Sequence, residues 1–436
     1  MTATPAADPV PGAEGNLTLS LSGLLGRSIT ARDGESLGRL SDVIVRLRGA
    51  GYPLVTGLVG TVGGRQVHVP VEQVSSFGAG ELRLTSARLN LRRFERREGE
   101  VLLRADVLGH RLIDVASAHL VRAADLQLAH RDGEWVLSGV DTRRRTGRVL
   151  RLLGHRRDRA VFRDQGQFEP LIGHTGSAVL RGPFARIRGL KPAQIADLIE
   201  DASKAEETEI LGRVHVDPEL EADVFEELDE DLATRLLDAR SDQEVAQVLS
   251  RMRADDAADA IAELPQHRRE PVLDLLPAGQ RAKVLTLMGF NPTSAGGLMG
   301  MDYLALPADT PVAEVLAAVR RAGSLQPEAL TSVHAVSETG RLLGVARLVT
   351  LVQADPGARL VEVSETDPVR VGADTDVVDV AVLMTDYNLI TIPVVDERCR
   401  MLGVITVDDV LEVTLPEGWR RREAAEPPDG RRGEPG

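Results

Sequence analysis

Two short acidic stretches carry the side chains best suited to chemistry in this sequence. One is "ADDAADAIAELP" (residues 254–265), and the other is "GVITVDDVLEV" (residues 403–413). Their carboxylates are hard oxygen donors, and Mg²⁺ takes such ligands, keeps several waters and needs only one or two carboxylates per site. Without an ion the two groups would repel each other, and a hydrated ion between them would draw them together. The predicted Mg²⁺ ligands are Asp255, Asp256, Asp259, Glu263, Asp408, Asp409 and Glu412.

The spacing within the first stretch places three carboxylates on one side of a helix. Asp255, Asp259 and Glu263 follow one another at intervals of four residues. Like charges at this spacing cost roughly a few tenths of a kcal/mol each, which a bound cation would offset. The alternative is that acids in a first helical turn are favoured by the helix dipole. That explanation covers Asp255 and Asp256, but it explains Glu263 poorly because Glu263 lies near the helix end.

Motifs for other kinds of chemistry are missing from the sequence. The nine histidines do not cluster with the spacing of a metal site, and there is no nucleophile elbow, P-loop or Rossmann turn. We therefore expect no enzymatic activity. The single cysteine, Cys399, excludes an intrachain disulfide, which predicts a reducing, cytoplasmic setting. No stretch reaches the roughly 18 consecutive apolar residues of a membrane helix, so we expect no membrane span.

The two acidic stretches must be held by different kinds of architecture. From Leu190 onward, apolar residues recur at helical spacing in short segments, which predicts an α-superhelix. Two repeats of about 60 residues follow, and each predicts strands alternating with helices. Both repeats contain the core V-x-[DE]-x-x-x-[LM]-L-G-V, in which Ser337 stands where the second copy has Asp396.

The amino-terminal part predicts small β-barrels. Short strand-like runs are separated by glycines, and one pair of runs meets across the tight-turn dipeptide Asp132-Gly133. The basic stretch "TRRRTGRVLRLLGHRRDR" then predicts a connector, or a short cationic helix with Leu150, Leu152 and Leu153 on one side. The predicted segments are a disordered tail (1–16), two β-barrel segments (17–90 and 91–145), the basic connector (146–189), the helical domain (190–295), the two repeats (296–360 and 361–416) and a second disordered tail (417–436).

Charge is distributed unevenly along the chain. Residues 1–189 contain 28 Lys and Arg against 19 Asp and Glu, a balance of +9, whereas residues 190–436 contain 24 against 47, a balance of −23. A basic half attracts polyanions, so its candidate partners are an anionic membrane surface, RNA or a protein. The alternative is that these arginines are only solvated.

Three known families resemble parts of this chain. The runs "LLGRSITARDGESLGRLSDVIV" and "HVPVEQV", and then "VLGHRLIDV" and "RAADLQL", resemble PRC-barrel domains, which are small docking barrels. The two repeats resemble a pair of CBS domains. The runs "AGGLM", "ADDAADAIAELP", "TIPVVDE" and "GVITVDDVL" resemble the cytosolic part of MgtE-type magnesium channels, in the same order. That family continues into transmembrane helices, whereas this sequence ends in the polar stretch "TLPEGWRRREAAEPPDGRRGEPG", so we expect the sensor without the pore.

The CBS resemblance implies a second ligand, an adenine nucleotide. CBS clefts often use a Thr or Ser followed three residues later by Asp to hold the ribose hydroxyls, and Thr406 and Asp409 fit that pattern. The first copy has Arg347 and Thr350 at these places, so its carboxylate is missing. Tyr303 matches the position of an aromatic that can stack on adenine in the magnesium-channel relatives. The alternative for Asp409 is a cap of the last helix.

These expectations combine into one description. The expected fold class is multidomain: all-β PRC-barrel-like modules, then an α-superhelical MgtE N-terminal-like domain, then an α/β CBS domain pair. The expected function is that of a non-enzymatic cytoplasmic sensor that binds Mg²⁺ between the helical and CBS domains and serves magnesium homeostasis. In the alternative, the protein is an adaptor that docks through its basic barrels and binds an adenine nucleotide in the CBS pair. CBS pairs commonly dimerise, so a homodimer is expected.

Overall fold

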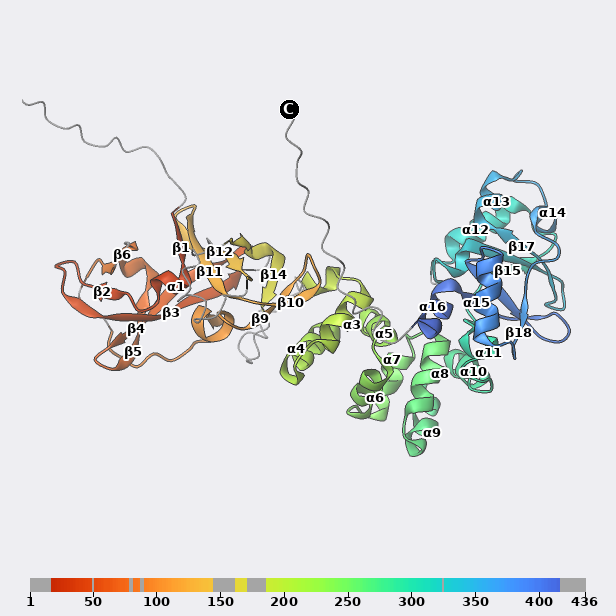
Figure 1. Ribbon diagram of the computed structural model, residues 1–436, viewed down its shortest axis with the longest axis horizontal. Helices are drawn as coiled ribbons and strands as arrows, with labels where there is room; N and C mark the ends of the chain where they lie inside the picture. The colour runs from red at the N-terminus through yellow and green to blue at the C-terminus, as the bar shows by residue number, and fades with distance from the viewer. Residues whose placement is uncertain are drawn as a thin grey trace, which may run out of the picture. The chain divides into compact units, whose positions relative to one another are not determined.

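The computed structural model divides the chain into two compact units, residues 1–229 and residues 230–436 (Figure 1). Strands come first along the chain, then helices, then strands mixed with helices, which confirms the predicted fold class. The predicted tails and the predicted cationic helix around Leu150, Leu152 and Leu153 lie outside the described residues. The structure describes residues 17–48, 51–77, 81–86, 90–143, 161–170, 186–323 and 325–415.

A large β-sheet organises the first unit. The strands of this unit are β1 (Thr18–Ser20), β2 (Ser28–Thr30), β3 (Ser36–Arg48), β4 (Gly51–Val62), β5 (Arg65–Pro70), β6 (Val74–Phe77), β7 (Glu81–Leu84), β8 (Glu100–Leu102), β9 (Arg111–Asp114), β10 (His119–Arg122), β11 (Asp125–Arg131), β12 (Glu134–Asp141), β13 (Arg163–Asp164) and β14 (Phe168–Pro170). Short helical turns lie between them: α1 (Leu21–Leu24), η1 (Val71–Gln73), η2 (Leu103–Val107), η4 (Gln165–Gln167) and η5 (Arg186–Gly189). Among the described residues the large sheet has 11 strands in the order β1-β11-β12-β4-β3-β2-β7-β6, with β13, β5 and β8 paired to β12, β4 and β3. A smaller sheet has the order β10-β9-β14.

The two β-barrel segments predicted over residues 17–90 and 91–145 share the large sheet. β3 and β4 form an antiparallel pair of 13 and 12 residues, and such long strands leave room for pairing with strands of both segments. β8 pairs with β3, and β12 pairs with β4, so the second segment completes the sheet of the first. The boundary drawn at residue 90 therefore does not separate two independent sheets.

Part of the predicted connector, residues 146–189, belongs to the β-fold. β13 pairs with β12, and β14 pairs with β9. Phe168 is 1% exposed in the core, and the guanidinium of Arg163 lies 4.8 Å from the centre of its ring. Arg163 also donates to the buried carboxylate of Asp114, with 2.5 Å between Nη1 and Oδ2. The connector prediction was wrong for residues 163–170, because one aromatic anchor and one ion pair fix a segment whose composition is mostly polar.

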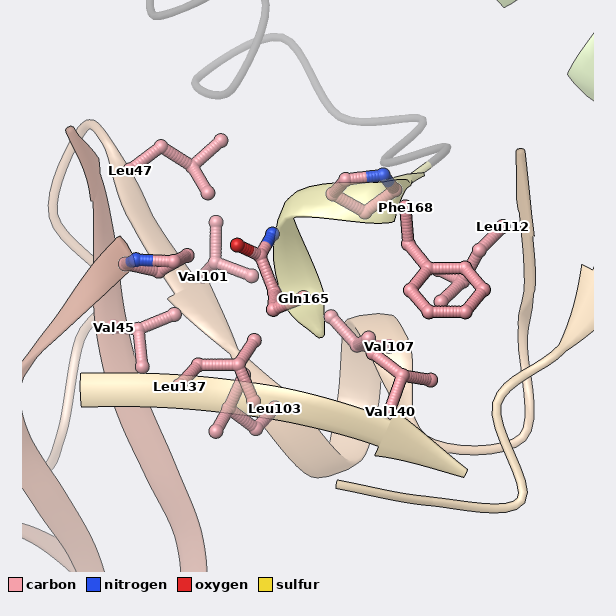
Figure 2. Close-up of a pocket in the computed structure, with 12 residues that line it drawn as sticks. Val45, Leu47, Val101, Leu103, Val107, Leu112, Leu137, Val140, Gln165 and Phe168 are labelled. Atoms are coloured by element: carbon pink, nitrogen blue, oxygen red, sulfur yellow. The ribbon is translucent and has the colours of Figure 1, made fainter. Parts of the chain in front are cut away.

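A small apolar cavity lies in the core of the first unit (Figure 2). The amide of Gln165 lies beside the apolar side chains that line it. Its volume of about 20 Å³ suffices for a single water molecule. The cavity is therefore too small for a nucleotide or an organic cofactor. Its apolar lining includes Val45, Val101, Leu103, Leu137, Val140 and Phe168.

Three helices complete the first unit: α3 (Pro192–Glu200), α4 (Lys204–Val214) and α5 (Pro218–Glu226). Proline opens α3 and α5, and a capping box of Ser203 and Glu206 opens α4. Arg111 of β9 donates to Glu206 (2.5 Å from Nη2 to Oε2) and to Asp201 (3.0 Å from Nη1 to Oδ2). The hydrogen bond from Arg111 lowers the pKa of Glu206 to about 2. The first helices of the helical domain are thus tied to the β-rich part of the chain.

The remaining helices of the helical domain belong to the second unit. α7 packs against α9, and α8 packs against α10, so each helix contacts the next but one, as in stacked helical arrays. A capping box of Ser241 and Glu244 opens α7, and Pro265 and Pro277 precede α9 and α10. The helices are α6 (Glu230–Asp238), α7 (Asp242–Leu249), α8 (Ala254–Glu263), α9 (Gln266–Leu275), α10 (Ala278–Leu287) and α11 (Ala295–Leu298).

The two sequence repeats fold as two copies of one α/β motif. The first contains β15 (Ala305–Pro307), α12 (Val312–Arg321), η6 (Ala329–Thr331), β16 (Ser332–Val336), β17 (Leu342–Arg347), α13 (Leu348–Gln353) and α14 (Leu360–Val363). The second contains β18 (Val371–Gly372), α15 (Val377–Asp386), β19 (Thr391–Val395), β20 (Met401–Thr406) and α16 (Val407–Thr414). Each sheet joins one parallel and one antiparallel pair, with a register shift at the equivalent place. Ser332 and Thr391, the first residues of β16 and β19, meet through a 3.1 Å hydrogen bond between their hydroxyls.

The run "AGGLM" joins the helical array to the second repeat. Gly300, directly after it, exchanges two backbone hydrogen bonds of 2.9 and 3.0 Å with Val404 of β20. A Cβ on Gly403 would lie 2.8 Å from the carbonyl oxygen of Gly300, and one on Gly297 would lie 2.3 Å from that of Asn291. Only glycine permits these close backbone approaches.

Candidate functional site

The first acidic group lies at the amino-terminal end of α8. Asp255 and Asp256 occupy the first turn, where the helix dipole favours carboxylates. Asp255 is only 7% exposed. Burial raises the pKa of Asp255, the attraction of Arg253 opposes this, and the charge of Asp409 adds to it. The dipole explains the position of these acids, but a buried carboxylate also needs a compensating charge.

The second acidic group lies at the amino-terminal end of α16. Thr406 is the residue before the helix, and Asp409 is in its first turn. One oxygen of Asp409, Oδ2, accepts hydrogen bonds from the hydroxyl of Thr406 (2.6 Å) and from its backbone N–H (3.1 Å). Asp409 is 8% exposed and Thr406 is 3% exposed. Asp409 thus does take part in capping the helix, but the cap residue is Thr406, and Asp409 lies three residues after it.

Arg253 connects these two helix ends. Its Nε donates to Oδ2 of Asp256 (2.6 Å), and its Nη1 donates to Oδ1 of Asp409 (2.8 Å). Burial lowers the pKa of the Arg253 guanidinium, but the carboxylates of Asp256, Asp255 and Asp409 outweigh it, and the net effect is a raised pKa. The structure therefore brings Asp255, Asp256 and Asp409 together around a cation that belongs to the chain itself.

A further set of carboxylates lies along α8, away from Arg253. Asp259 is exposed at the surface, yet crowding by the surrounding atoms and the charges of Asp255, Glu230 and Glu263 raise its pKa to about 6. Glu230 comes from the start of α6, and the other two residues belong to α8. Glu230 therefore adds a fourth carboxylate to the predicted helical face of Asp255, Asp259 and Glu263, and the spacing along the helix did not indicate it.

The remaining predicted ligands lie on the surface of α16. Asp408 and Glu412 are both exposed, and the contact from α16 to α8 described above runs through Asp409 and Arg253. In the part of the chain that the structure describes, no three His, Cys, Asp or Glu side chains are grouped so that they could hold a metal ion. Mg²⁺ binding by the seven predicted residues therefore stays a prediction.

A cleft of about 490 Å³ lies between the two repeats of the second unit. This volume is within the usual range of small-molecule sites. Thr331, Ser332 and Arg347 of the first copy line it together with residues 388–391 of the second. The predicted nucleotide residues Tyr303, Thr406 and Asp409 are not among the residues that line it. The cleft instead includes Arg347, the first-copy counterpart of Thr406.

Tyr303 contacts a buried histidine. The rings of Tyr303 and His334 meet edge to face with 5.8 Å between their centres. Nδ1 of His334 lies 3.2 Å from the carbonyl oxygen of Leu304, while its buried Nε2 has no hydrogen-bond partner in the part of the chain that the structure describes. Burial lowers the pKa of His334 to about 4. Tyr303 is thus placed to pack on the imidazole, and adenine stacking by this residue stays a prediction.

The sequence patterns did not indicate two residues, Arg253 and His334. Arg253 directly precedes the acidic run of α8, at the cap position where Ser, Thr, Asp or Asn is usual. An arginine at a cap position is unusual, and this could have pointed to a special role. His334 occupies the place that Pro393 has in the second repeat, and only the alignment of the two copies could have indicated it.

Comparison with known proteins assigns the second half of the chain. The MgtE intracellular N domain family matches residues 190–293, and the CBS domain family matches residues 360–415. The magnesium transporter MgtE of Thermus thermophilus is 40% identical over 168 residues, which cover 37% of this chain and 37% of that protein. MgtE of Bacillus subtilis is 24% identical over 228 residues, or 52% of this chain and 50% of that protein. The chain thus spans half or less of the length of these relatives.

One solved structure shows the fold of this region, and a second is similar in sequence to it. The soluble part of a magnesium transporter matches 54% of this chain and 92% of that chain, with a TM-score of 0.50 and 21% identity. The cytosolic domain of the Mg²⁺ channel MgtE in complex with ATP matches 54% of this chain and 97% of that chain, with a TM-score of 0.49 and 32% identity. None of the helices described here has both the length and the apolar character needed to cross a membrane. The chain therefore carries an MgtE intracellular N domain followed by a CBS pair, and in this region it resembles the cytosolic part of MgtE-type magnesium transporters.

Proposed function

We propose that residues 190–415 form a non-enzymatic regulatory module that responds to Mg²⁺ and serves magnesium homeostasis. The observation that carries this proposal is the concentration of negative charge on α6 and α8, where the charges of Asp255, Glu230 and Glu263 raise the pKa of Asp259. The similarity of this region to magnesium transporters supports the choice of ion.

The chemistry of Mg²⁺ suits this group. Mg²⁺ dehydrates reluctantly and is usually held by one or two carboxylates while it keeps several waters. A hydrated ion beside Asp259 needs no cage of three protein ligands. It would offset the mutual repulsion of the carboxylates, which at about 4 Å amounts to about 1 kcal/mol per pair in water and more near a protein surface.

We expect Mg²⁺ to slow hydrogen exchange in α8 of the full chain relative to EDTA at equal ionic strength. An ion at ten times its Kd stabilises the form that binds it by about 1.4 kcal/mol, or about tenfold in protection. Asp259→Asn should remove most of this response, because it deletes the central carboxylate. Asp386→Asn, on the exposed side of α15, is the matched control and should keep the response. Equal exchange of α8 in Mg²⁺ and in EDTA for the unmodified protein would refute the proposal.

A second ligand is favoured by the cleft between the repeats. We propose that it takes an adenine nucleotide, with the base against the apolar side chains of Val349, Val352 and Pro393 and the phosphates toward the exposed guanidinium of Arg347. Arginine is well suited to phosphate because its planar fork donates two parallel hydrogen bonds. In the sequence-based assignment the ribose is held by Asp409, but both oxygens of that carboxylate already accept hydrogen bonds, from Thr406 and from Arg253.

Calorimetry with ATP on the full chain distinguishes these two assignments. Arg347→Ala should weaken binding about 10- to 100-fold, the usual loss for a charged hydrogen bond. Arg341 is an exposed residue directly before β17, at the end opposite Arg347. Arg341→Ala should therefore leave the affinity for ATP unchanged. Loss of binding in Asp409→Ala with full affinity in Arg347→Ala would restore the sequence-based site, and no heat with the unmodified protein would reject the nucleotide.

The remaining expectations about partners stay predictions. The homodimer through the CBS pair agrees with the exposed apolar side chains of α15, where Val378 is 59% and Val382 is 52% exposed. Sedimentation of the full chain at micromolar concentration would show whether it forms this homodimer.

Docking of the basic amino-terminal half on a membrane, RNA or protein has its strongest sequence signal at residues 142–159, of which 144–159 lie outside the described residues. Binding to anionic vesicles that weakens steeply with salt would support the membrane alternative.

A further inference from the structure

We propose that Arg253 is a built-in cation that clamps the start of α8 to the start of α16, so that this contact between the helical domain and the CBS pair holds without a divalent ion. Arg253 donates to Asp256 on its own helix and to Asp409, 156 residues further along the chain. A single side chain thus joins two helix ends that each carry carboxylates.

The guanidinium of Arg253 lies in a largely buried place with defined hydrogen-bond partners. The side chain of Arg253 is 24% exposed, that of Asp256 is 22% exposed and that of Asp409 is 8% exposed. With its oxygen turned toward Arg253, the side-chain amide of Gln326 lies 3.0 Å from Nη1 and 3.3 Å from Nε. Gln326 precedes η6 in the first CBS copy, so the guanidinium reaches the helical domain and both CBS copies.

The charge balance explains why a cation is needed at this place. Asp256 and Asp409 lie on the two sides of the contact and both accept hydrogen bonds from Arg253, and the charge of Asp255 also acts on the guanidinium. Removing one partner from a largely buried pair leaves the other charge uncompensated, which costs far more than the loss of a surface pair. Without Arg253, the carboxylates would repel, and the contact would open unless another cation took its place.

An arginine clamp differs from an ion in one respect that can be measured. Its local concentration is fixed by the chain, so the contact does not depend on the concentration of free Mg²⁺. Mg²⁺ would then act on the carboxylates around Asp259, which lie along the same helix. This last step rests on the function proposed above, whereas the clamp itself does not.

The test is hydrogen exchange of α8 and α16 in the full chain, in EDTA. Arg253→Gln should lower the protection of both helices by about 10- to 100-fold, the usual loss for hydrogen bonds to charged groups. Arg253→Lys keeps the positive charge but loses the planar guanidinium that can bond two carboxylates at once. Its protection of α8 and α16 should lie between that of the unmodified protein and that of Arg253→Gln. Arg400→Gln, which removes an exposed pair with Asp396 in the same CBS copy, is the matched control and should leave both helices unchanged.

A double variant separates the clamp from a general loss of folding. Asp409→Asn alone should also loosen the contact, and Arg253→Gln combined with Asp409→Asn should cost less than the two single changes added together. Additive effects, or unchanged protection in Arg253→Gln, would overturn the clamp. Adding Mg²⁺ to Arg253→Gln then tests the other proposal by itself: a rise in the protection of α8 supports ion binding beside Asp259, and loosening in EDTA with no rise in Mg²⁺ leaves the clamp standing while the Mg²⁺ response fails.

Discussion

Arg213→Met is expected to destabilise the first unit by about 3–5 kcal/mol, the usual cost of removing one partner from a buried ion pair. The guanidinium of Arg213 contacts Glu169 and donates to Oε1 of Glu209 (2.7 Å) and to the carbonyl oxygen of Pro170 (2.8 Å). The side chains of Arg213 and Glu209 are each 5% exposed. Without the arginine two carboxylates stay in a poorly solvated place, and α4 loses its link to β14.

Urea unfolding followed by the fluorescence of Trp135 measures this effect. Trp135 packs against Phe77 in the core of the first unit, and a Trp419→Phe background leaves it as the single tryptophan. The control is Arg48→Met, whose ion pair with Glu134 is 47% exposed on both sides and should contribute about 1 kcal/mol or less. Adding Glu209→Gln to Arg213→Met should recover part of the loss. A cost for Arg213→Met no larger than that for Arg48→Met would contradict the expectation.

His334 should make the CBS pair sensitive to acid. Burial lowers the pKa of His334 to about 4, whereas an unfolded histidine titrates near 6.5. The unfolded state therefore binds the proton more readily between these values, so the stability present above pH 6.5 is lost as pH falls toward 4. The loss amounts to about 3 kcal/mol once the pH is below 4. Among the described residues, none accepts a hydrogen bond from Nε2, so a second proton there would be uncompensated by them.

His334→Leu is expected to lose less stability than the unmodified protein between pH 7 and pH 4.5, by about 2–3 kcal/mol. The carbonyl of Leu304 keeps the hydrogen bond from the backbone N–H of residue 334, so the variant leaves no new unsatisfied acceptor. Unfolding of the CBS pair is followed by the hydrogen exchange of β16 peptides across a urea series at each pH. His267→Leu, at an exposed position of α9, is the control and should retain the full pH dependence. An imidazole resonance of His334 that titrates near 6.5 would reject the premise directly.

The sequence by itself determined the local structure around the candidate sites. Helical spacing placed Asp255, Asp259 and Glu263 on one helix, and the internal repeat predicted the two α/β copies with their equivalent strands. A capping role was also predicted for Asp409, although the structure places Thr406 at the cap and Asp409 three residues after it. These features depend on residues within a few positions of one another, so periodicity and capping preferences suffice to predict them.

Only the tertiary structure decided which distant groups meet. The partner of Asp409 is a guanidinium 156 residues away, and the cleft between the repeats is lined by Arg347 and not by Thr406 or Asp409. The merging of the two β-barrel segments into one sheet and the burial of Phe168 in a mostly polar stretch have the same origin. Such contacts follow from how preformed elements pack, and the pattern of apolar residues fixes which face of an element is buried without fixing what that face will touch.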